Sequence, residues 1–357
     1  MNVESRSLPF FHPSTGLYRF TLLVFVSLLT VGSYFAYDII AAISDRLMAK
    51  MGADQGQIGL INSMYSIAAI VAVFVAGFLI DNLGTRKATL IFAGIVVVGA
   101  IVMALARHVT LLYVGRFVFG AGSEPLIIAQ STILARWFKG KELALAFGIS
   151  LAVSRLGSIF ALNTGNLIIE RFGDPMYALV VATIICFLSF LSCLVFIAMD
   201  RRGERILRLK DGAVEEKITL NDIRHFKPSF WYVSILCVTF YSAVFPFQTL
   251  APSFFTEKWG IPDVAAGAGS FLQRVFFNLT HMFSTAGGVT SIIIFASMIF
   301  APFMGRAVDK IGKRASLMIF GSILIIPCHL ALGLTRISPA MTMVVLGVAF
   351  VLVPAAM

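Results

Sequence analysis

Ten long runs of apolar residues constrain this chain more than any other feature. We expect nine complete spans and a tenth that the end of the sequence interrupts. An α-helix needs roughly 20 apolar residues to cross a hydrocarbon layer about 30 Å thick. Charged residues make up only 13% of the chain, whereas soluble domains contain about 25%. The sequence therefore predicts an all-α polytopic membrane protein. The expected spans lie near Leu17–Ala42, Ile58–Ile80, Ala88–Ala106, Thr110–Ala135, Leu143–Ile169, Tyr177–Met199, Phe230–Thr256, Val289–Pro302, Ala315–Leu334 and Ala340–Met357.

Basic residues in the connections predict the orientation of these spans. Most of the 28 Lys and Arg residues fall in loops on the same side as the N-terminus, and such loops face the cytoplasm. The net charge of +10 therefore belongs to a membrane face, and no nucleic-acid partner is expected. The longest polar connection predicts three parts: a six-helix half over residues 1–199, a cytoplasmic linker over 200–229, and a partial second half of about four helices over 230–357.

A short motif recurs in both halves and predicts related loops. Residues 77–87 and 305–314 both read G-x-x-x-D-x-x-G followed by basic residues, each after the second span of its half. The first glycine permits close helix approach, the second permits a tight turn, and the aspartate can pair with a neighbouring donor. We expect a cytoplasmic gate, and the alternative is a purely structural turn. The assigned residues are Gly77, Asp81, Gly84, Arg86, Lys87, Gly305, Asp309, Gly312, Lys313 and Arg314.

Together with Arg116, Gly120 and Gly122 of the fourth span, these loops resemble the signatures of the major facilitator superfamily. The resemblance implies a fold of two six-helix halves with the substrate site between them. The chain then covers the first half and about four helices of the second.

Several longer strings resemble one family within that superfamily, the lysosomal dipeptide transporters. The matching strings are Gly32–Asp38, Gly115–Glu124, Trp137–Leu143, Arg155–Ser158, Ala243–Phe247 and Phe255–Lys258. The resemblance implies uniport of dipeptides across a lysosomal membrane, or across a plasma or inner membrane if the source is not eukaryotic. It also implies a glycosylated lumenal accessory protein. Two departures are Pro125, which follows the glutamate, and a longer outside loop after Lys258.

Two charged residues inside apolar runs are the strongest candidates for substrate binding. Glu124 lies about 21 Å along the fourth span and Arg155 about 18 Å along the fifth, so both are expected near the middle of the membrane on adjacent antiparallel helices. A buried charge is costly unless it is paired or lines a wet cavity. We expect Arg155 to bind a peptide carboxylate and Glu124 an ammonium group, and the alternative is a permanent structural ion pair.

Other polar residues in the spans are weaker candidates. Arg116 is expected about 9 Å from the outer end of its helix, with a gating or a helix-packing role. Tyr34, Tyr37 and Asp38 form a polar cluster that either lines the cavity or belongs to an interfacial aromatic belt. The further cavity candidates are Asn163, Asn166, Tyr241 and Gln248.

The remaining motifs narrow the class of protein. Asn278 begins an N-x-T glycosylation sequon in an expected outside loop. No catalytic, metal or cofactor-binding pattern occurs, and the four cysteines show no CxxC spacing. We therefore expect a transporter rather than an enzyme. The alternatives are a proton-coupled carrier of small organic anions and a solute-sensing receptor or scaffold with a transporter fold.

Overall fold

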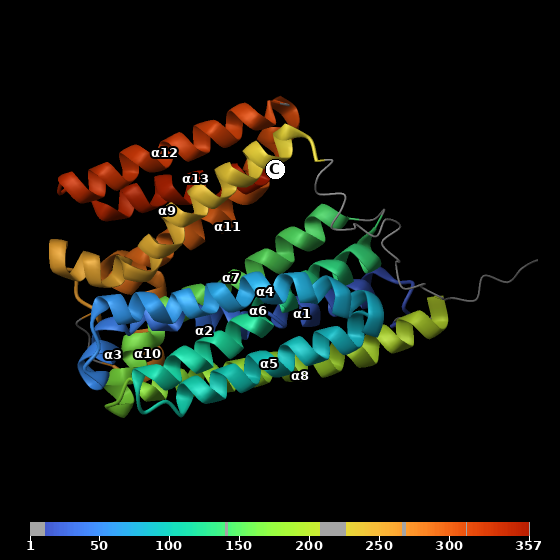
Figure 1. Cartoon of the computed structure of the whole chain (residues 1–357), viewed down its shortest axis with the longest axis horizontal. Helices are drawn as coiled ribbons and strands as arrows, with labels where there is room; N and C mark the ends of the chain where they lie inside the picture. The colour runs from blue at the N-terminus through green and yellow to red at the C-terminus, as the bar shows by residue number, and fades with distance from the viewer. Residues whose placement is uncertain (1–10, 140–141, 208–225, 266–268, 312, 357) are drawn as a thin grey trace, which may run out of the picture.

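The computed structural model describes residues 11–139, 142–207, 226–265, 269–311 and 313–356 (Figure 1). All regular elements in these ranges are helices, and eight helical spans, the first of which covers Gly16–Ala42, are long and apolar enough to cross a membrane. The all-α membrane fold is therefore confirmed. The helices of the first half are α1 (Gly16–Leu28), α2 (Val31–Ala42), α3 (Ser44–Met51), α4 (Gln55–Leu83), α5 (Thr85–Ala104), α6 (Val109–Phe138), α7 (Leu143–Phe172) and α8 (Met176–Leu207).

The second half contains five α-helices and one short 3₁₀ helix in the described ranges. They are α9 (Pro228–Trp259), α10 (Phe271–Thr280), η2 (Met282–Ser284), α11 (Ala286–Ile311), α12 (Arg314–Leu334) and α13 (Pro339–Ala356). We call the end of the bundle where α8 ends and α9 begins the linker end, and the opposite end, where α3 and α10 lie, the α10 end (Figure 1).

The structure differs from the expected elements in two helix boundaries and in two additional helices. α8 continues to Leu207, so residues 200–207 extend the last helix of the first half, and 208–225 of the expected linker lie outside the described residues. α11 runs from Ala286 to Ile311, so it extends beyond both ends of the expected span. The amphipathic helices α3 and α10 lie in connections that the apolar pattern alone did not identify.

The first span is interrupted rather than continuous, because Leu29 and Thr30 separate α1 from α2. Carbonyl groups freed by such a break must find donors inside a membrane protein. Gln130 on α6 donates to the Val26 carbonyl at 2.9 Å and to the Ser150 hydroxyl at 2.8 Å. The Thr30 hydroxyl lies 2.6 Å from that of Ser154 on α7. Buried polar groups of α6 and α7 thus hold the break in the helix.

The two halves contact each other towards the α10 end and diverge towards the linker end (Figure 1). Ser253 of α9 donates to Asp45 at 2.6 Å. Asn163 of α7 donates to Ser291 of α11 at 3.0 Å. The hydrogen bonds of Ser44, Asn163 and Asn278 and the ion pair of Arg274 also join or flank the halves at this end.

Gly287 marks the closest backbone approach in this contact. A Cβ atom built on Gly287 would lie 2.0 Å from the carbonyl oxygen of Leu162. Such a distance is sterically impossible, so any side chain at Gly287 must push α11 away from α7.

We predict that Gly287→Ala lowers the free energy of unfolding by about 1–3 kcal/mol, the usual cost of overpacking. The matched control is Gly148→Ala, also in a helix, where a Cβ atom meets nothing within 4 Å. That control is expected to be neutral or slightly stabilising, because alanine is the better helix former. Thermal unfolding of both variants in detergent measures the difference, and equal Tm values would contradict the packing described here.

Candidate functional site

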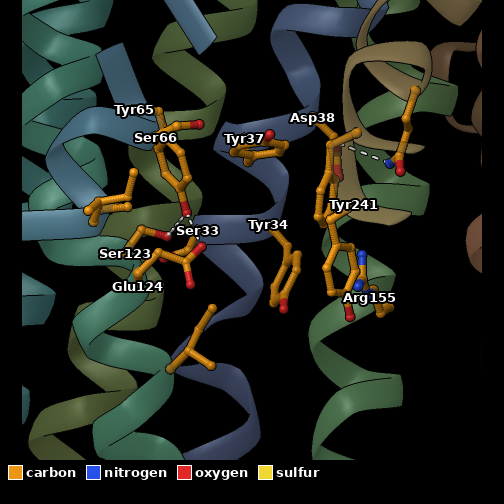
Figure 2. Close-up of a pocket in the computed structure, with 15 residues that line it drawn as sticks. Ser33, Tyr34, Tyr37, Asp38, Tyr65, Ser66, Ser123, Glu124, Arg155 and Tyr241 are labelled. Carbon is orange, nitrogen blue, oxygen red and sulfur yellow. Dashed lines mark hydrogen bonds between the residues drawn. The ribbon is translucent and has the colours of Figure 1, made fainter. Parts of the chain in front are cut away.

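A cavity of about 450 Å³ lies between the two halves (Figure 2). Four helices of the first half and α9 of the second half form the wall of this cavity. Movement of one half against the other could therefore open the cavity to either side of the membrane. The volume falls within the usual range for small-molecule sites. The lining residues are Ser33, Tyr34, Tyr37 and Asp38 of α2, Tyr65, Ser66, Ala69 and Ile70 of α4, Ser123, Glu124 and Ile127 of α6, Arg155 of α7, and Tyr241, Phe245 and Gln248 of α9.

Glu124 is held on the α6 side of this cavity by a tyrosine. The Tyr65 hydroxyl donates to the Glu124 carboxylate at 2.6 Å, and the Ser123 hydroxyl lies 3.2 Å from the same tyrosine oxygen. A hydrogen bond to an ionised carboxylate is stronger than a neutral one. Pro125 follows within the same helix and removes one backbone donor there. The carboxylate is therefore positioned by Tyr65 while it still faces the cavity.

Arg155 lies on the other side of the cavity against aromatic rings. Its guanidinium carbon is 5.0 Å from the ring centre of Tyr34 and 5.3 Å from that of Phe350 on α13. Cation–π contacts of this kind stabilise a charge without neutralising it.

The two charges do not form the ion pair that the sequence left open. Within the described part of the chain, neither Glu124 nor Arg155 has an ion-pair partner within 4 Å. Figure 2 shows Tyr34 of α2 between them, so α2 separates the two side chains although α6 and α7 are consecutive in the sequence. The carboxylate and the guanidinium thus face one cavity from opposite walls.

Asp38 adds a second carboxylate to the cavity. Its side chain is buried, and Gln248 of α9 donates to it at 3.4 Å, which joins the two halves (Figure 2). Tyr37 of α2 and Tyr241 of α9 line the same cavity. The polar cluster of the first span therefore faces the interior of the protein. Residues of an interfacial aromatic belt would instead face the lipid headgroups.

Arg116 does not line the cavity but lies behind it in the first half. It is fully buried and donates to the carbonyl oxygens of Ala36 and Tyr37 at 3.0 Å and to Asn62 at 2.8 Å. Its guanidinium also lies 4.6 Å from the Tyr37 ring centre. These contacts tie α6 to α2 and α4, so the geometry corresponds to the helix-packing alternative rather than to a contact between halves.

Three asparagines that the sequence singled out lie away from the cavity lining. Asn163 donates to Ser291, and Asn166 donates to the Ala42 carbonyl at 2.8 Å. Asn278 is 3% exposed and donates to the Asn163 carbonyl at 3.0 Å. The Asn278 amide nitrogen is thus buried against α7 in this structure, and glycosylation at this sequon stays a prediction.

The first copy of the loop motif forms a tight turn at the linker end. Gly84 has a φ of +79° and separates α4 from α5, as the turn requires. A Cβ atom on Gly77 would meet nothing within 4 Å among the described atoms, so the expected close approach is absent there. Asp81 and Lys87 are exposed.

Arg86 of this motif pairs with α8 rather than with Asp81. It contacts the carboxylates of Asp200 and Glu204. Asp200 is also bonded at 2.6 Å by the indole nitrogen of Trp137. The motif's basic residue thus fastens α5 to α8 within the first half.

The second copy of the motif is described only in part. α11 ends at Ile311 and α12 begins at Arg314, which is the same helix junction that Gly84 occupies in the first half. Lys313 is exposed. Gly312 and the side chains of Gly305, Asp309 and Arg314 lie outside the described residues.

Tyr65 is the functional candidate that sequence reasoning missed. It lies within the apolar run of α4, where a tyrosine is an unusual polar group, and this was the only available signal. Among the described residues, no group of three or more His, Cys, Asp or Glu residues could hold a metal ion, and the four cysteines form no disulfide.

Comparison with known proteins agrees with this architecture. The Major Facilitator Superfamily model matches residues 26–357, and the chain belongs to that superfamily of membrane transporters. It is similar to the curated lysosomal dipeptide transporter MFSD1 of Danio rerio, with 34% identity over 362 residues covering 98% of this chain and 74% of the relative. Its identity to the Homo sapiens protein of that name is 33% over 358 residues, covering 97% and 73%.

Solved structures share the fold at low sequence identity. The chain is similar to a partially occluded inward open conformation of the xylose transporter XylE from E. coli, with a TM-score of 0.70, 15% identity, and coverage of 95% of this chain and 85% of the other. It is also similar to the nucleoside transporter NupG, with a TM-score of 0.68, 14% identity, and coverage of 94% and 81%.

We predict that Arg116→Lys lowers the free energy of unfolding by about 3 kcal/mol, because a lysine cannot reach three oxygens on two helices from one planar group. Thermal unfolding of the purified protein measures this effect. Arg107→Lys is the control, since Arg107 is exposed in the loop before α6. An Arg116→Lys variant as stable as this control would contradict the packing role.

Proposed function

We propose that this transporter moves dipeptides by alternating access, as a uniporter and without a bound cofactor. One observation carries the proposal: Glu124 and Arg155 face the same cavity from opposite walls without an ion-pair partner among the described residues. A dipeptide carries an ammonium group at one end and a carboxylate at the other. It can therefore supply the missing partner of each side chain at once.

The proposed roles follow from the placement of each group. Arg155 binds the peptide carboxylate through its planar set of donors. Glu124, positioned by Tyr65, binds the ammonium group. Tyr34, Tyr37 and Tyr241 present aromatic faces that tolerate different side chains. The curated relatives named as dipeptide transporters support this substrate class.

The orientation and membrane are part of the same proposal. With the basic linker end in the cytoplasm, the conformation described here is closed on the other side of the membrane and corresponds to an inward-facing state. The names of the curated relatives favour a lysosomal membrane. We retain a glycosylated lumenal accessory protein as a proposed partner.

Two alternatives make different predictions. A proton-coupled carrier of small organic anions would use Arg155 as its anion anchor, and its flux would depend on a pH gradient. A sensor or scaffold with this fold would bind solutes without moving them. Dipeptide flux into liposomes containing the purified protein, with and without a pH gradient, separates these alternatives from uniport.

We predict that Glu124→Gln and Arg155→Ala each weaken dipeptide transport by about tenfold or more, which corresponds to loss of one charge-assisted hydrogen bond of about 1.5 kcal/mol. Counterflow of a labelled dipeptide in proteoliposomes measures the effect. Glu257→Gln and Arg107→Ala are matched controls at exposed positions and should leave transport unchanged. Undiminished counterflow in both cavity variants would overturn the proposed roles.

A further inference from the structure

Helix α10 presents its polar and apolar faces in the reverse of the usual order. Its polar face turns towards the protein: Arg274 pairs with Glu170 of α7 at 2.6 Å, and Asn278 is buried against α7. The opposite face turns away and is mostly apolar, with Leu272 77% and Phe276 70% exposed beside the exposed Gln273 and Thr280. A helix on the surface of a soluble protein does the opposite, because the apolar face is the one that packs on the core.

The contacts of α10 also fix its depth along α7. The 30 residues of α7 measure about 45 Å, so a helix centred on a hydrocarbon layer of about 30 Å extends about 7 Å beyond each boundary. Asn163, which Asn278 contacts, lies about 13 Å from the α10 end of this helix by the same rise. The C-terminal part of α10 therefore lies below the boundary, inside the hydrocarbon layer.

The N-terminal part of α10 lies nearer to the boundary. Glu170, the partner of Arg274, is close to the end of α7, and the exposed Ser270 and Gln273 form a capping box that satisfies the first backbone donors of α10. The helix thus enters the layer with its polar start near water. Near the C-terminal end of α10, Asn278 is buried against the protein.

We propose that the C-terminal part of α10 inserts into the leaflet at the α10 end and that lipid acyl chains cover its exposed apolar face. Leu272 and Phe276 are separated by four residues and lie on one helix face, which contacts the acyl chains. Arg274 and Asn278 use the opposite face to hold α10 against α7, at the place where the halves close. Lipid, rather than water or a second protein, completes this surface.

The depth of α10 in the membrane and the polarity of its exposed face together indicate that lipid covers that face. An apolar face at hydrocarbon depth is stable in contact with lipid, whereas the same face in water would cost about 25 cal/mol for each Å² exposed. The inward-facing polar groups are paired within the protein, as groups in a membrane must be.

The test uses the full chain in phosphatidylcholine vesicles, with the four native cysteines replaced by alanine and one spin label at a time. Labels at Leu272→Cys and Phe276→Cys report collision with oxygen, which concentrates in lipid, and with a nickel chelate, which stays in water. Leu188→Cys on the apolar face of α8 is the lipid control. Arg107→Cys, in an exposed loop at the α10 end, is the water control.

We expect the Phe276 label to match the Leu188 control, with high oxygen and low nickel accessibility, and the Leu272 label, nearer the boundary, to give values between the Leu188 and Arg107 controls. Nickel accessibility at Phe276 equal to that at Arg107 would overturn the proposal, because the face would then contact water. Low accessibility to both reagents would also overturn it, since protein would then cover the face. If the cysteine-free chain does not fold, hydroxyl-radical footprinting of the native chain in the same vesicles decides: lipid contact protects Phe276 relative to the exposed Tyr177 of α8, and equal modification contradicts the proposal.

Discussion

The cost of a charge inside a hydrocarbon layer organises this structure. Arg116 meets that cost by donating to three oxygens on two neighbouring helices, so it is buried and packed. Glu124 and Arg155 meet it differently, because each is oriented by aromatic neighbours and left facing a cavity. The free-energy cost of a buried charge is therefore met in two ways. Arg116 is satisfied by packing within the first half, whereas Glu124 and Arg155 remain available to a ligand.

The closed end of the bundle depends on small and polar groups rather than on charge. Gly287 allows α11 to touch the backbone of α7, and Asn163 bonds both to Ser291 and, through its carbonyl, to Asn278. Hydrogen bonds of this kind are individually modest in membrane proteins. A contact built from them can hold one conformation and still open, which alternating access requires.

The fold was predictable from the sequence because length and hydropathy determine membrane spans. The repeated glycine–aspartate loop placed the helix junctions, and Gly84 adopts the positive φ that its turn requires. The break at Thr30 was not predictable, because its compensation comes from Gln130 and Ser154, more than 90 residues away. Local pattern carries no information about such a distant partner.

The cavity was predictable only in part. Charges within apolar runs identified Glu124 and Arg155, but depth along a helix does not specify its rotation. The side chains therefore line one cavity with α2 between them, Asn163 turns to the closed end, and Tyr65 enters from α4.

The central claim is that each charge binds one end of a dipeptide. Affinities of a dipeptide, its N-acetyl form and its C-terminal amide for wild type, Glu124→Gln and Arg155→Ala test it most directly. Acetylation should weaken binding in wild type but not in Glu124→Gln, and amidation should do so in wild type but not in Arg155→Ala; equal losses in all three proteins would contradict the account.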